Sequence, residues 1–431
     1  MVELPSAFLQ RMKRSLGSEF DKFLESYSKP VARGVRVNTL KISVDAFKDV
    51  CPLPLDGKVP WEPRAFYVDK DGLGKTIAHE AGLYYVQEPS AMCSAPRVEA
   101  NPGERVLDLC SAPGGKGTQL AQDMCGEGVL VLNEIVQKRA EILRSNVERL
   151  GVTNAVVTCA DPETLAKIFK NYFDKILVDA PCSGEGMFKK EEAAIPEWSE
   201  QNVRLCAERQ SRILDCADKM LAAGGRLVYS TCTFAEAEDE EQVENFLKTH
   251  KNYSLKYKEK LMPHKVRGEG HFCAVLEKLE GERYNIGCVV PKIQNKPLLN
   301  AYREWEQATL NVRLERLLQV NSSLYYIAED TPDLTGLGLK YNSGVYIGTL
   351  AKDGKRFEPS HAFAMCLSAD KVRCVEVDEQ TALKYLQGLT FCCGLPSGWY
   401  VVAYRGYPLG WCKVANETAK NHYPKSLRTR K

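Results

Sequence analysis

Short apolar runs alternate with amphipathic segments between residues 102 and 279, and this alternation constrains the fold more than any other feature. Five runs have the length and apolar content of strands: 105–109, 128–132, 155–158, 175–178 and 227–230. Helical spacing of apolar residues predicts helices from Thr118 onward and over residues 136–150, 202–221 and 236–248. This order predicts an α/β fold with a mostly parallel sheet and helices on both faces. Such sheets bind ligands at the carboxyl ends of their strands.

The chain outside this segment lacks the alternation. Before it, a charged amphipathic helix is expected near residues 5–27 and a strand within residues 34–41. After residue 281, strand-like runs at 344–349, 372–377 and 398–404 are separated by glycine and proline turns, which indicates small α+β modules. A chain of 431 residues exceeds the usual size of one core. We therefore divide it into residues 1–100, 101–280, 281–370 and 371–431.

Composition narrows the class of protein. Hydrophobic residues make up 44% of the chain and charged residues 26%, as in ordinary soluble proteins. No apolar stretch approaches the about 18 residues that a membrane span needs, and no leader pattern opens the chain, so a cytoplasmic protein without membrane contact is expected. The 16 cysteines include no CxxC pair, which argues against a structural metal site.

A glycine-rich loop follows the first strand of the alternating segment. Gly114 and Gly115 lie just before a predicted helix, whose unpaired N–H groups suit the carboxylate of a bound amino-acid moiety. The sequence is not GxxxxGK[ST], so a loop that cradles phosphates is disfavoured. A plain tight turn is the alternative interpretation, because glycine loops alone are weak signals.

Acidic residues follow the next two strands. Glu134 lies about 20 residues past the glycines, where an acid accepts hydrogen bonds from a ribose diol. Asp161 follows the third strand and is placed to reach an adenine edge. Together the two acids favour a nucleoside ligand without pyrophosphate. Each of them is equally well explained as a helix cap or a solvated turn residue.

Two cysteines follow the fourth and fifth strands. Cys182 lies just after Asp179, and Cys232 follows the last predicted strand, so both are expected at the edge of the sheet where ligands bind. Most cysteines in such a chain are inert core residues. Methylation of a pyrimidine at carbon 5, however, requires a soft nucleophile, because a thiolate that adds to carbon 6 makes carbon 5 reactive.

The end of the chain is basic although the whole protein carries a net charge of only +2. Residues 404–431 contain seven lysines and arginines against one glutamate. A concentrated basic patch is typical of phosphate contacts, and Lys413, Lys420 and Lys425 are its candidate RNA-binding residues. The alternative is a frayed, solvated tail.

Three motifs resemble those of the NOL1/NOP2/Sun family of RNA cytosine-5 methyltransferases. They read LCSAPGGK at residues 109–116, DAPCSGEGMF at 179–188 and YSTCTF at 229–234. RVNTLK at 36–41 and VQEPSA at 86–91 are similar to the N-terminal motifs of the family. The ending, with YRGYPLGWCK and KNHYPK, is similar to the branch of bacterial ribosomal small-subunit methyltransferases F.

This resemblance implies a Rossmann-like S-adenosylmethionine-dependent methyltransferase domain over residues 101–280. It also implies an N-terminal RNA-contacting region, the small α+β module over 281–370, and a PUA-like RNA-binding module over 371–431. The cofactor site is implied for Cys110, Ser111, Ala112, Pro113, Gly114, Gly115, Lys116, Glu134, Asp161 and Asp179. No metal is required, and we expect a monomer.

The resemblance also implies the catalytic roles. Cys232 is the implied nucleophile, Cys182 assists product release, Asp179 binds the base and favours protonation of its ring nitrogen, and Lys116 contacts the cofactor loop and the base. The chain departs from the family at Gly117, where threonine is usual, and at residues 235–240, which read AEAEDE.

The implied substrate is a cytosine in RNA, taken out of its stack to reach the nucleophile. Small-subunit ribosomal RNA, or the subunit itself, is the favoured partner. Two alternatives remain: the same chemistry on tRNA, and a non-catalytic RNA-binding assembly factor.

Overall fold

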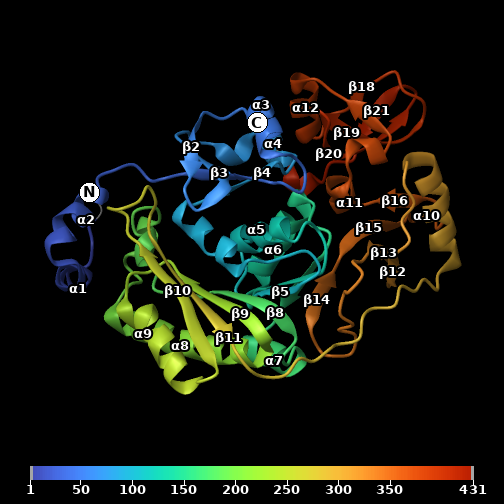
Figure 1. Cartoon of the computed structure of the whole chain (residues 1–431). Helices are drawn as coiled ribbons and strands as arrows, with labels where there is room; N and C mark the ends of the chain where they lie inside the picture. Colours follow the sequence, from blue (N-terminus) through green and yellow to red (C-terminus); the bar gives the residue numbers. More distant parts are fainter. Residues whose placement is uncertain (1–2, 429–431) are drawn as a thin grey trace.

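The computed structural model describes residues 3–428 and joins the four regions into one molecule (Figure 1). A large sheet lies at its centre, with a smaller sheet from the N-terminal region above it in the view of Figure 1 and the C-terminal modules on the right. Within residues 3–428, no helix is long and apolar enough to cross a membrane.

The central sheet has eight strands in the order β10-β11-β9-β8-β5-β6-β7-β14. Its middle is parallel, as predicted: β5 (Arg105–Asp108), β6 (Val129–Asn133), β7 (Ala155–Cys159), β8 (Phe173–Asp179) and β9 (Leu221–Thr231). Three antiparallel strands extend it: β10 (Tyr253–Leu261) and β11 (His271–Lys278) at one edge and β14 (Lys340–Ser343) at the other. None of these three was expected from the alternation. β14 comes from the third region, so that region contributes a strand to the sheet of the second.

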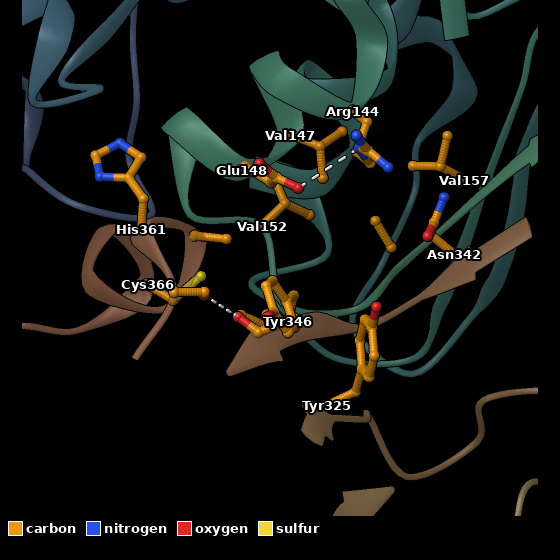
Figure 2. Close-up of a pocket in the computed structure, with 15 residues that line it drawn as sticks. Arg144, Val147, Glu148, Val152, Val157, Tyr325, Asn342, Tyr346, His361 and Cys366 are labelled. Atoms are coloured by element: carbon orange, nitrogen blue, oxygen red, sulfur yellow. Dashed lines mark hydrogen bonds and ion pairs between the residues drawn. The ribbon is translucent and has the colours of Figure 1, made fainter. Parts of the chain in front are cut away.

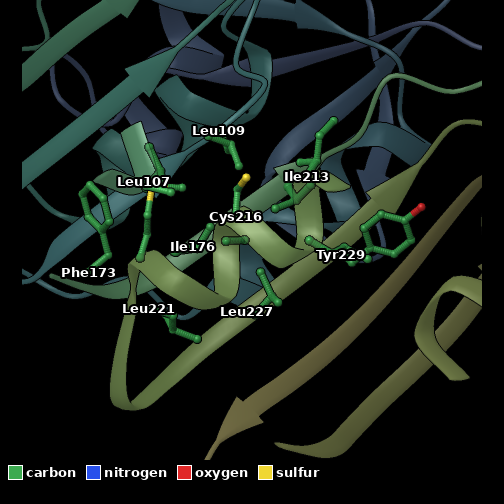
Figure 3. Close-up of a cluster of buried hydrophobic side chains, with 14 of the residues drawn as sticks. Leu107, Leu109, Phe173, Ile176, Ile213, Cys216, Leu221, Leu227 and Tyr229 are labelled. Atoms are coloured by element: carbon green, nitrogen blue, oxygen red, sulfur yellow. The ribbon is translucent and has the colours of Figure 1, made fainter. Parts of the chain in front are cut away.

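Five helices pack on the central sheet: α5 (Gly115–Asp123), α6 (Gln137–Leu150), α7 (Pro162–Ile168), α8 (Glu200–Met220) and α9 (Glu240–Thr249). On one face, Ile213 and Cys216 of α8 are buried with Ile176 and Leu227 of the sheet (Figure 3). α5 begins at Gly115 rather than near Thr118, because Gly114 adopts a positive φ of 111° and starts the helix earlier. α8 runs directly into β9, so that strand is longer than predicted.

The N-terminal region begins with α1 (Ser6–Leu16) and α2 (Phe20–Ser26), which a turn at Gly17 separates. The single helix expected here is therefore wrong, because Gly17 has a φ of 51°. A four-stranded sheet follows, in the order β2 (Leu55–Val59), β3 (Glu62–Val68), β1 (Gly34–Val37) and β4 (Tyr84–Gln87). Two short helices, α3 (Val44–Val50) and α4 (Ile77–Glu80), connect its strands.

The C-terminal part forms two small sheets. After α10 (Lys296–Thr309), the first contains β12 (Leu317–Val320), β13 (Ser323–Tyr326), β15 (Val345–Leu350) and β16 (Phe357–Pro359) and is followed by α11 (His361–Cys366). The second has the order β17 (Cys374–Glu376), β19 (Gly398–Tyr404), β20 (Tyr407–Ala415), β21 (Thr418–Asn421) and β18 (Phe391–Cys392), with α12 (Glu379–Leu386) beside it. The strands predicted within 344–349, 372–377 and 398–404 are present as β15, β17 and β19.

The last module returns to the N-terminal region. Apolar residues of the N-terminal sheet, such as Val35 and Tyr84, belong to the same buried cluster as Tyr400 and Leu409 of the last sheet. Tyr423, which follows the last sheet, donates a hydrogen bond to Glu80 of α4. The first and last regions therefore share one core.

Candidate active site

The carboxyl ends of the five parallel strands bring the predicted site residues to one edge of the central sheet. The loop from Cys110 to Lys116 follows β5, Glu134 follows β6, Asp161 follows β7, Asp179 ends β8 with Cys182 just after it, and Cys232 follows β9. Parallel strands in register guarantee this convergence, because all of their carboxyl ends point to the same side.

The glycines of the loop after β5 allow close packing of the protein itself. A Cβ atom on Gly114 would lie 3.0 Å from Leu143 of α6, and one on Gly115 would lie 3.3 Å from Tyr85 and Gln87 of β4. The loop is therefore clamped between α6 and the N-terminal sheet. This leaves the backbone N–H groups of the first turn of α5 beside the strand ends, as an amino-acid carboxylate requires.

Two buried acceptors below this loop have no partner. Within residues 3–428, neither carboxylate oxygen of Asp108, nor the hydroxyl of Ser111, makes a well-aligned hydrogen bond to a protein group, although Ser111 and the Cys110 backbone lie close enough to oppose the effect of burial on the pKa of Asp108. Burial raises the pKa of Asp108 to about 7. A Cβ on Gly117 would lie 2.6 Å from Ser111 Oγ and 3.0 Å from Asp108 Oδ2, so the unusual glycine makes room for them. Unpaired acceptors at this place fit a ligand that brings N–H donors, such as S-adenosylmethionine.

Arg36 holds the first turn of α5 in place from the N-terminal sheet. It is fully buried, and its guanidinium donates to the backbone oxygen of Gly115 at 2.7 Å, to Thr118 Oγ1 at 2.8 Å and to the side chains of Gln87 and Gln122. From the sequence, Arg36 was expected only as part of a strand that is similar to a family motif, with no role at the site. A charged residue within a buried strand was the available signal for a structural role.

Lys116 and Asp179 form an ion pair across the site. Lys116 Nζ lies 2.9 Å from Asp179 Oδ2, and Ser230 Oγ donates to Asp179 Oδ1 at 2.9 Å. Burial is the largest influence and raises the pKa of Asp179, but Lys116, His271 and the hydrogen bond from Ser230 together outweigh it, so the pKa lies below its ordinary value. The carboxylate is therefore ionised at neutral pH while its side chain remains 31% exposed.

The two predicted cysteines meet at this edge. The Sγ atoms of Cys182 and Cys232 lie 3.3 Å apart, and both residues are half-buried. The hydrogen bond with Cys232, burial and the negative charge of Glu238 raise the pKa of Cys182 well above its ordinary value. Cys182 is therefore disfavoured as an anion, and in the contact between the two sulfurs either atom can be the donor.

The acidic stretch after Cys232 fixes both cysteine loops. Glu238 accepts from the backbone N–H of Ser183 at 2.9 Å and from Gln210 of α8 at 2.9 Å, which braces the loop after Cys182. Asp239 accepts a hydrogen bond from Thr231, next to Cys232. The departure from the family at residues 235–240 therefore leaves both loops anchored by carboxylates.

The two acids predicted to bind a nucleoside have protein partners. Glu134, 3% exposed, accepts from the backbone N–H of Val136 at 2.9 Å and lies 3.1 Å from a guanidinium nitrogen of Arg139. Asp161 caps α7 and accepts from the N–H of Thr164 at 2.8 Å. The capping alternative thus holds for Asp161, and contacts of either acid with a nucleoside stay predictions.

The basic residues near the C-terminus lie on the last sheet. Lys413 of β20 and Lys420 of β21 are cross-strand neighbours, and the Lys413 ammonium lies 5.5 Å from the ring centroid of Trp399. Lys425 is exposed in a short turn after β21. Residues 430 and 431, also counted in the basic ending, lie outside the described residues. A lysine pair beside an aromatic ring is compatible with RNA contact.

A separate cavity of about 460 Å³ lies between α6 and the C-terminal modules (Figure 2). Arg144, Val147 and Glu148 of α6 line one side, and Tyr325 and Tyr346 line the other. None of the predicted catalytic residues or cofactor residues contributes to it. The cavity lies at the boundary between the second and third regions of the chain and is separate from the candidate active site.

Comparison with known proteins gives the family. In an alignment that spans 467 positions, the chain is 32% identical to ribosomal RNA small subunit methyltransferase F of Vibrio vulnificus. The match covers 99% of this chain and 98% of the relative. The chain belongs to the family of these methyltransferases F. The enzyme of the same name from Cronobacter sakazakii is 40% identical over 253 residues, which cover 56% of this chain and 53% of that protein.

Family models described for methyltransferases F match successive parts of the chain. Residues 96–277 match 16S rRNA methyltransferase RsmB/F, and residues 4–89 match the N-terminal domain of RsmF. Residues 304–367 match its first C-terminal domain, and residues 372–429 match its PUA domain. A PUA domain supports RNA binding by the last module, as the sequence predicted.

Solved structures agree with the fold. A methyltransferase homologue from Pyrococcus horikoshii is 30% identical, with a TM-score of 0.58, and covers 64% of this chain and 96% of its own. NSun6 of the same organism, solved with the cofactor analogue SFG, is 22% identical with a TM-score of 0.58 over 64% of this chain and 99% of its own, and shares the fold. As a methyltransferase F, the protein is an S-adenosylmethionine-dependent RNA methyltransferase, so the non-catalytic alternative is wrong.

Proposed function

We propose that the protein methylates carbon 5 of a cytosine in small-subunit ribosomal RNA through a covalent bond between Cys232 and the base. The observation that carries this proposal is the pair of sulfurs 3.3 Å apart, beside the Lys116–Asp179 ion pair. Methylation of nitrogen or oxygen needs no thiol, whereas methylation of this carbon requires a thiolate.

The asymmetry of the two thiols supports Cys232 as the nucleophile. In the proposed state Cys182 holds its proton and donates it to the Cys232 sulfur, 3.3 Å away. A thiolate, not a thiol, adds to carbon 6. Burial of Cys182 against Glu238 keeps the second thiol protonated and therefore unsuited to attack.

Asp179 prepares the base for this attack. An ionised carboxylate against the pyrimidine edge favours a protonated ring nitrogen N3, which withdraws electrons from carbon 6. Lys116 and Ser230 each bind one carboxylate oxygen of Asp179. These contacts orient the carboxylate before the base binds. The proton on N3 comes from solvent and returns to it when the base is released.

The cofactor supplies an electrophilic methyl group on a sulfonium sulfur. The residues that would hold it are the loop Cys110–Lys116, with Glu134 at the ribose, Asp161 at the adenine and Asp179 beside the methionine moiety. Addition of Cys232 at carbon 6 gives carbon 5 the electron density of an enamine, directed at this methyl group.

Cys182 completes the reaction. It passes its proton to the departing sulfur of Cys232, and the Cys182 thiolate left behind accepts the proton that carbon 5 must lose. The bond between Cys232 and carbon 6 breaks, and the aromatic ring is restored. Both sulfurs then carry a proton, and release of the Cys232 proton to solvent regenerates the starting state.

Relatives with this name act on ribosomal RNA of the small subunit, which favours that substrate over tRNA. Bisulfite sequencing of small-subunit rRNA and of tRNA, from cells with and without the gene, tests the proposal. We expect a cytosine in the rRNA that resists conversion only when the gene is present. Gene-dependent resistance in tRNA alone would favour the tRNA alternative, and no gene-dependent site in either RNA would refute methylation at carbon 5.

A further inference from the structure

A buried histidine stands beside the catalytic carboxylate without a partner. His271 begins β11, where the adjacent residue Phe272 pairs with Thr231 of β9, so His271 lies next to the strand end that carries Cys232. It is 1% exposed. Within residues 3–428, neither of its ring nitrogens makes a hydrogen bond.

Asp179 is the group that this imidazole faces. His271 Nε2 lies 3.7 Å from Asp179 Oδ1, which is just beyond hydrogen-bonding distance. The same oxygen accepts from Ser230 of β9, and the other oxygen pairs with Lys116 of α5. Burial, with the Lys116 cation adding to it, lowers the pKa of His271 to about 3, so the ring is neutral.

An unpaired polar side chain at such a position costs free energy that an apolar ring would not cost. This cost is offset only in a state in which the His271 imidazole makes a hydrogen bond. A carboxylate oxygen accepts more than one hydrogen bond, so Asp179 Oδ1 has room for a second donor beside Ser230. A shift of less than 1 Å brings the ring within reach of it.

We propose that His271 is a positioning residue for Asp179, donating Nε2–H to Asp179 Oδ1 when the base is bound. This proposal rests on the proposed function, because it assigns His271 to the carboxylate that binds the cytosine. A neutral donor orients the carboxylate without bringing a second positive charge beside Lys116. Ser230, Lys116 and His271 then fix Asp179 from three different elements, which restricts its rotation against the base.

The test compares two substitutions of His271. His271→Phe keeps the ring volume and removes the donor, whereas His271→Asn restores an N–H donor. With small-subunit rRNA from cells that lack the gene as substrate, we expect His271→Phe to lower kcat about tenfold, the factor that corresponds to one pKa unit of interaction. The KM for S-adenosylmethionine should not change, and His271→Asn should recover most of kcat.

His361 supplies the matched control. It is a half-buried histidine whose Nδ1 is buried and unpaired within residues 3–428, and it packs against Tyr423 in the C-terminal part, away from Asp179. His361→Phe should leave kcat unchanged, which separates a general effect of losing a buried histidine from an effect on Asp179. Thermal unfolding of all variants shows whether each of them folds, and His271→Leu replaces His271→Phe if that variant does not.

A second measurement is independent of methylation. Nitrogen-15 NMR of the histidine rings at pH 6.5, assigned by the signal lost in His271→Phe, should show His271 neutral with its proton on Nε2. A protonated ring, or a proton on Nδ1, would overturn the proposal. Equal kcat for wild type and His271→Phe would overturn it while methylation of cytosine stands. If wild type methylates no cytosine, the proposed function fails and the NMR result decides the tautomer alone.

Discussion

At the scale of single residues, the site depends on which of two neighbouring thiols keeps its proton. Two sulfurs 3.3 Å apart do not both ionise near neutral pH, because the second negative charge is placed beside the first. In the proposed mechanism the proton stays on Cys182, because the Cys232 sulfur beside it, burial and Glu238 all disfavour its anion. The two side chains are chemically identical, and their different surroundings favour opposite roles.

Glu134 gives a prediction about the cofactor. Glu134→Ala should weaken binding of S-adenosylmethionine by roughly 1–3 kcal/mol, the usual cost of losing a charged hydrogen-bond partner. Isothermal titration measures this, with Glu141→Ala on the exposed side of α6 as the control. Unchanged affinity in a folded Glu134→Ala variant would show that the acid only braces Arg139 and the start of α6.

Asp108 predicts a pH dependence of stability. Its folded pKa of about 7 lies above the ordinary value near 4, so the folded state binds the proton more tightly than the unfolded state. The contribution of Asp108 to the free energy of unfolding is therefore at its maximum below about pH 4 and is lost as the pH rises to about 7. Asp108→Asn has no such loss. The free energy of unfolding of Asp108→Asn, relative to that of wild type, should therefore increase between pH 5 and 8 by on the order of 2–4 kcal/mol.

Thermal or denaturant unfolding at several pH values measures that difference directly. Other buried acids titrate in both proteins and cancel in the comparison. A difference between the two proteins that does not change with pH would mean that Asp108 is ionised in the folded protein.

At the scale of elements, the position of α5 depends on a side chain from another sheet. Arg36→Met should remove the donors to Gly115, Thr118, Gln87 and Gln122 and leave buried acceptors unpaired. We expect a loss of about 3 kcal/mol in stability, with weaker cofactor binding in the molecules that remain folded. Arg33→Met is the control, because Arg33 pairs with Asp71 at the surface. Similar effects of both substitutions would contradict this role.

The elements that the sequence predicted best are those with a strong local pattern. The five parallel strands and α6 follow from apolar runs and helical spacing. β10, β11 and β14 were missed because antiparallel edge strands with one exposed face, such as Tyr253–Leu261, carry many charged residues. α7 was missed although Asp161 followed by Pro162 is a helix start signal, since Asp161 had been assigned to a ligand.

The candidate site divides in the same way. Residues within short motifs, namely Lys116, Asp179, Cys182 and Cys232, converge as their positions after strands predicted. Arg36 and His271 reach the site from distant segments and were not predicted for it, because only the tertiary fold brings them there. Ser230 and Glu238 lie close to Cys232 in the sequence, but their contacts with Asp179 and with the loop after Cys182 depend on how the strands pair.

At the scale of the whole molecule, the N-terminal helices cover the edge of the sheet that carries the cysteines. Phe8 of α1 packs on Phe188 with ring centroids 5.3 Å apart, and Phe23 of α2 packs on Phe234 at 5.7 Å. These contacts place the N-terminal helices on the loops that follow Cys182 and Cys232. At the other end, Tyr423 donates to Glu80 of α4 at 2.8 Å and ties the last module to the N-terminal sheet.

This arrangement predicts that the last module supports RNA binding without touching the cofactor. Neutralising Lys413, Lys420 and Lys425 together should weaken RNA binding and reduce its log–log salt slope by up to about 0.7 for each lost contact with single-stranded RNA. Affinity for S-adenosylmethionine should be unchanged. Binding titrations over a range of salt concentrations measure the slope, and an identical slope would identify the patch as solvated surface.

The central claim is that Cys232 attacks the base and Cys182 releases it. Cys232→Ala and Cys182→Ala are each incubated with S-adenosylmethionine and small-subunit rRNA from cells that lack the gene, and run on a denaturing gel. Cys182→Ala should add to the base, transfer the methyl group and stall, which gives a protein–RNA band that resists denaturation. Cys232→Ala should give neither adduct nor product. An adduct from Cys232→Ala, with none from Cys182→Ala, would contradict the account.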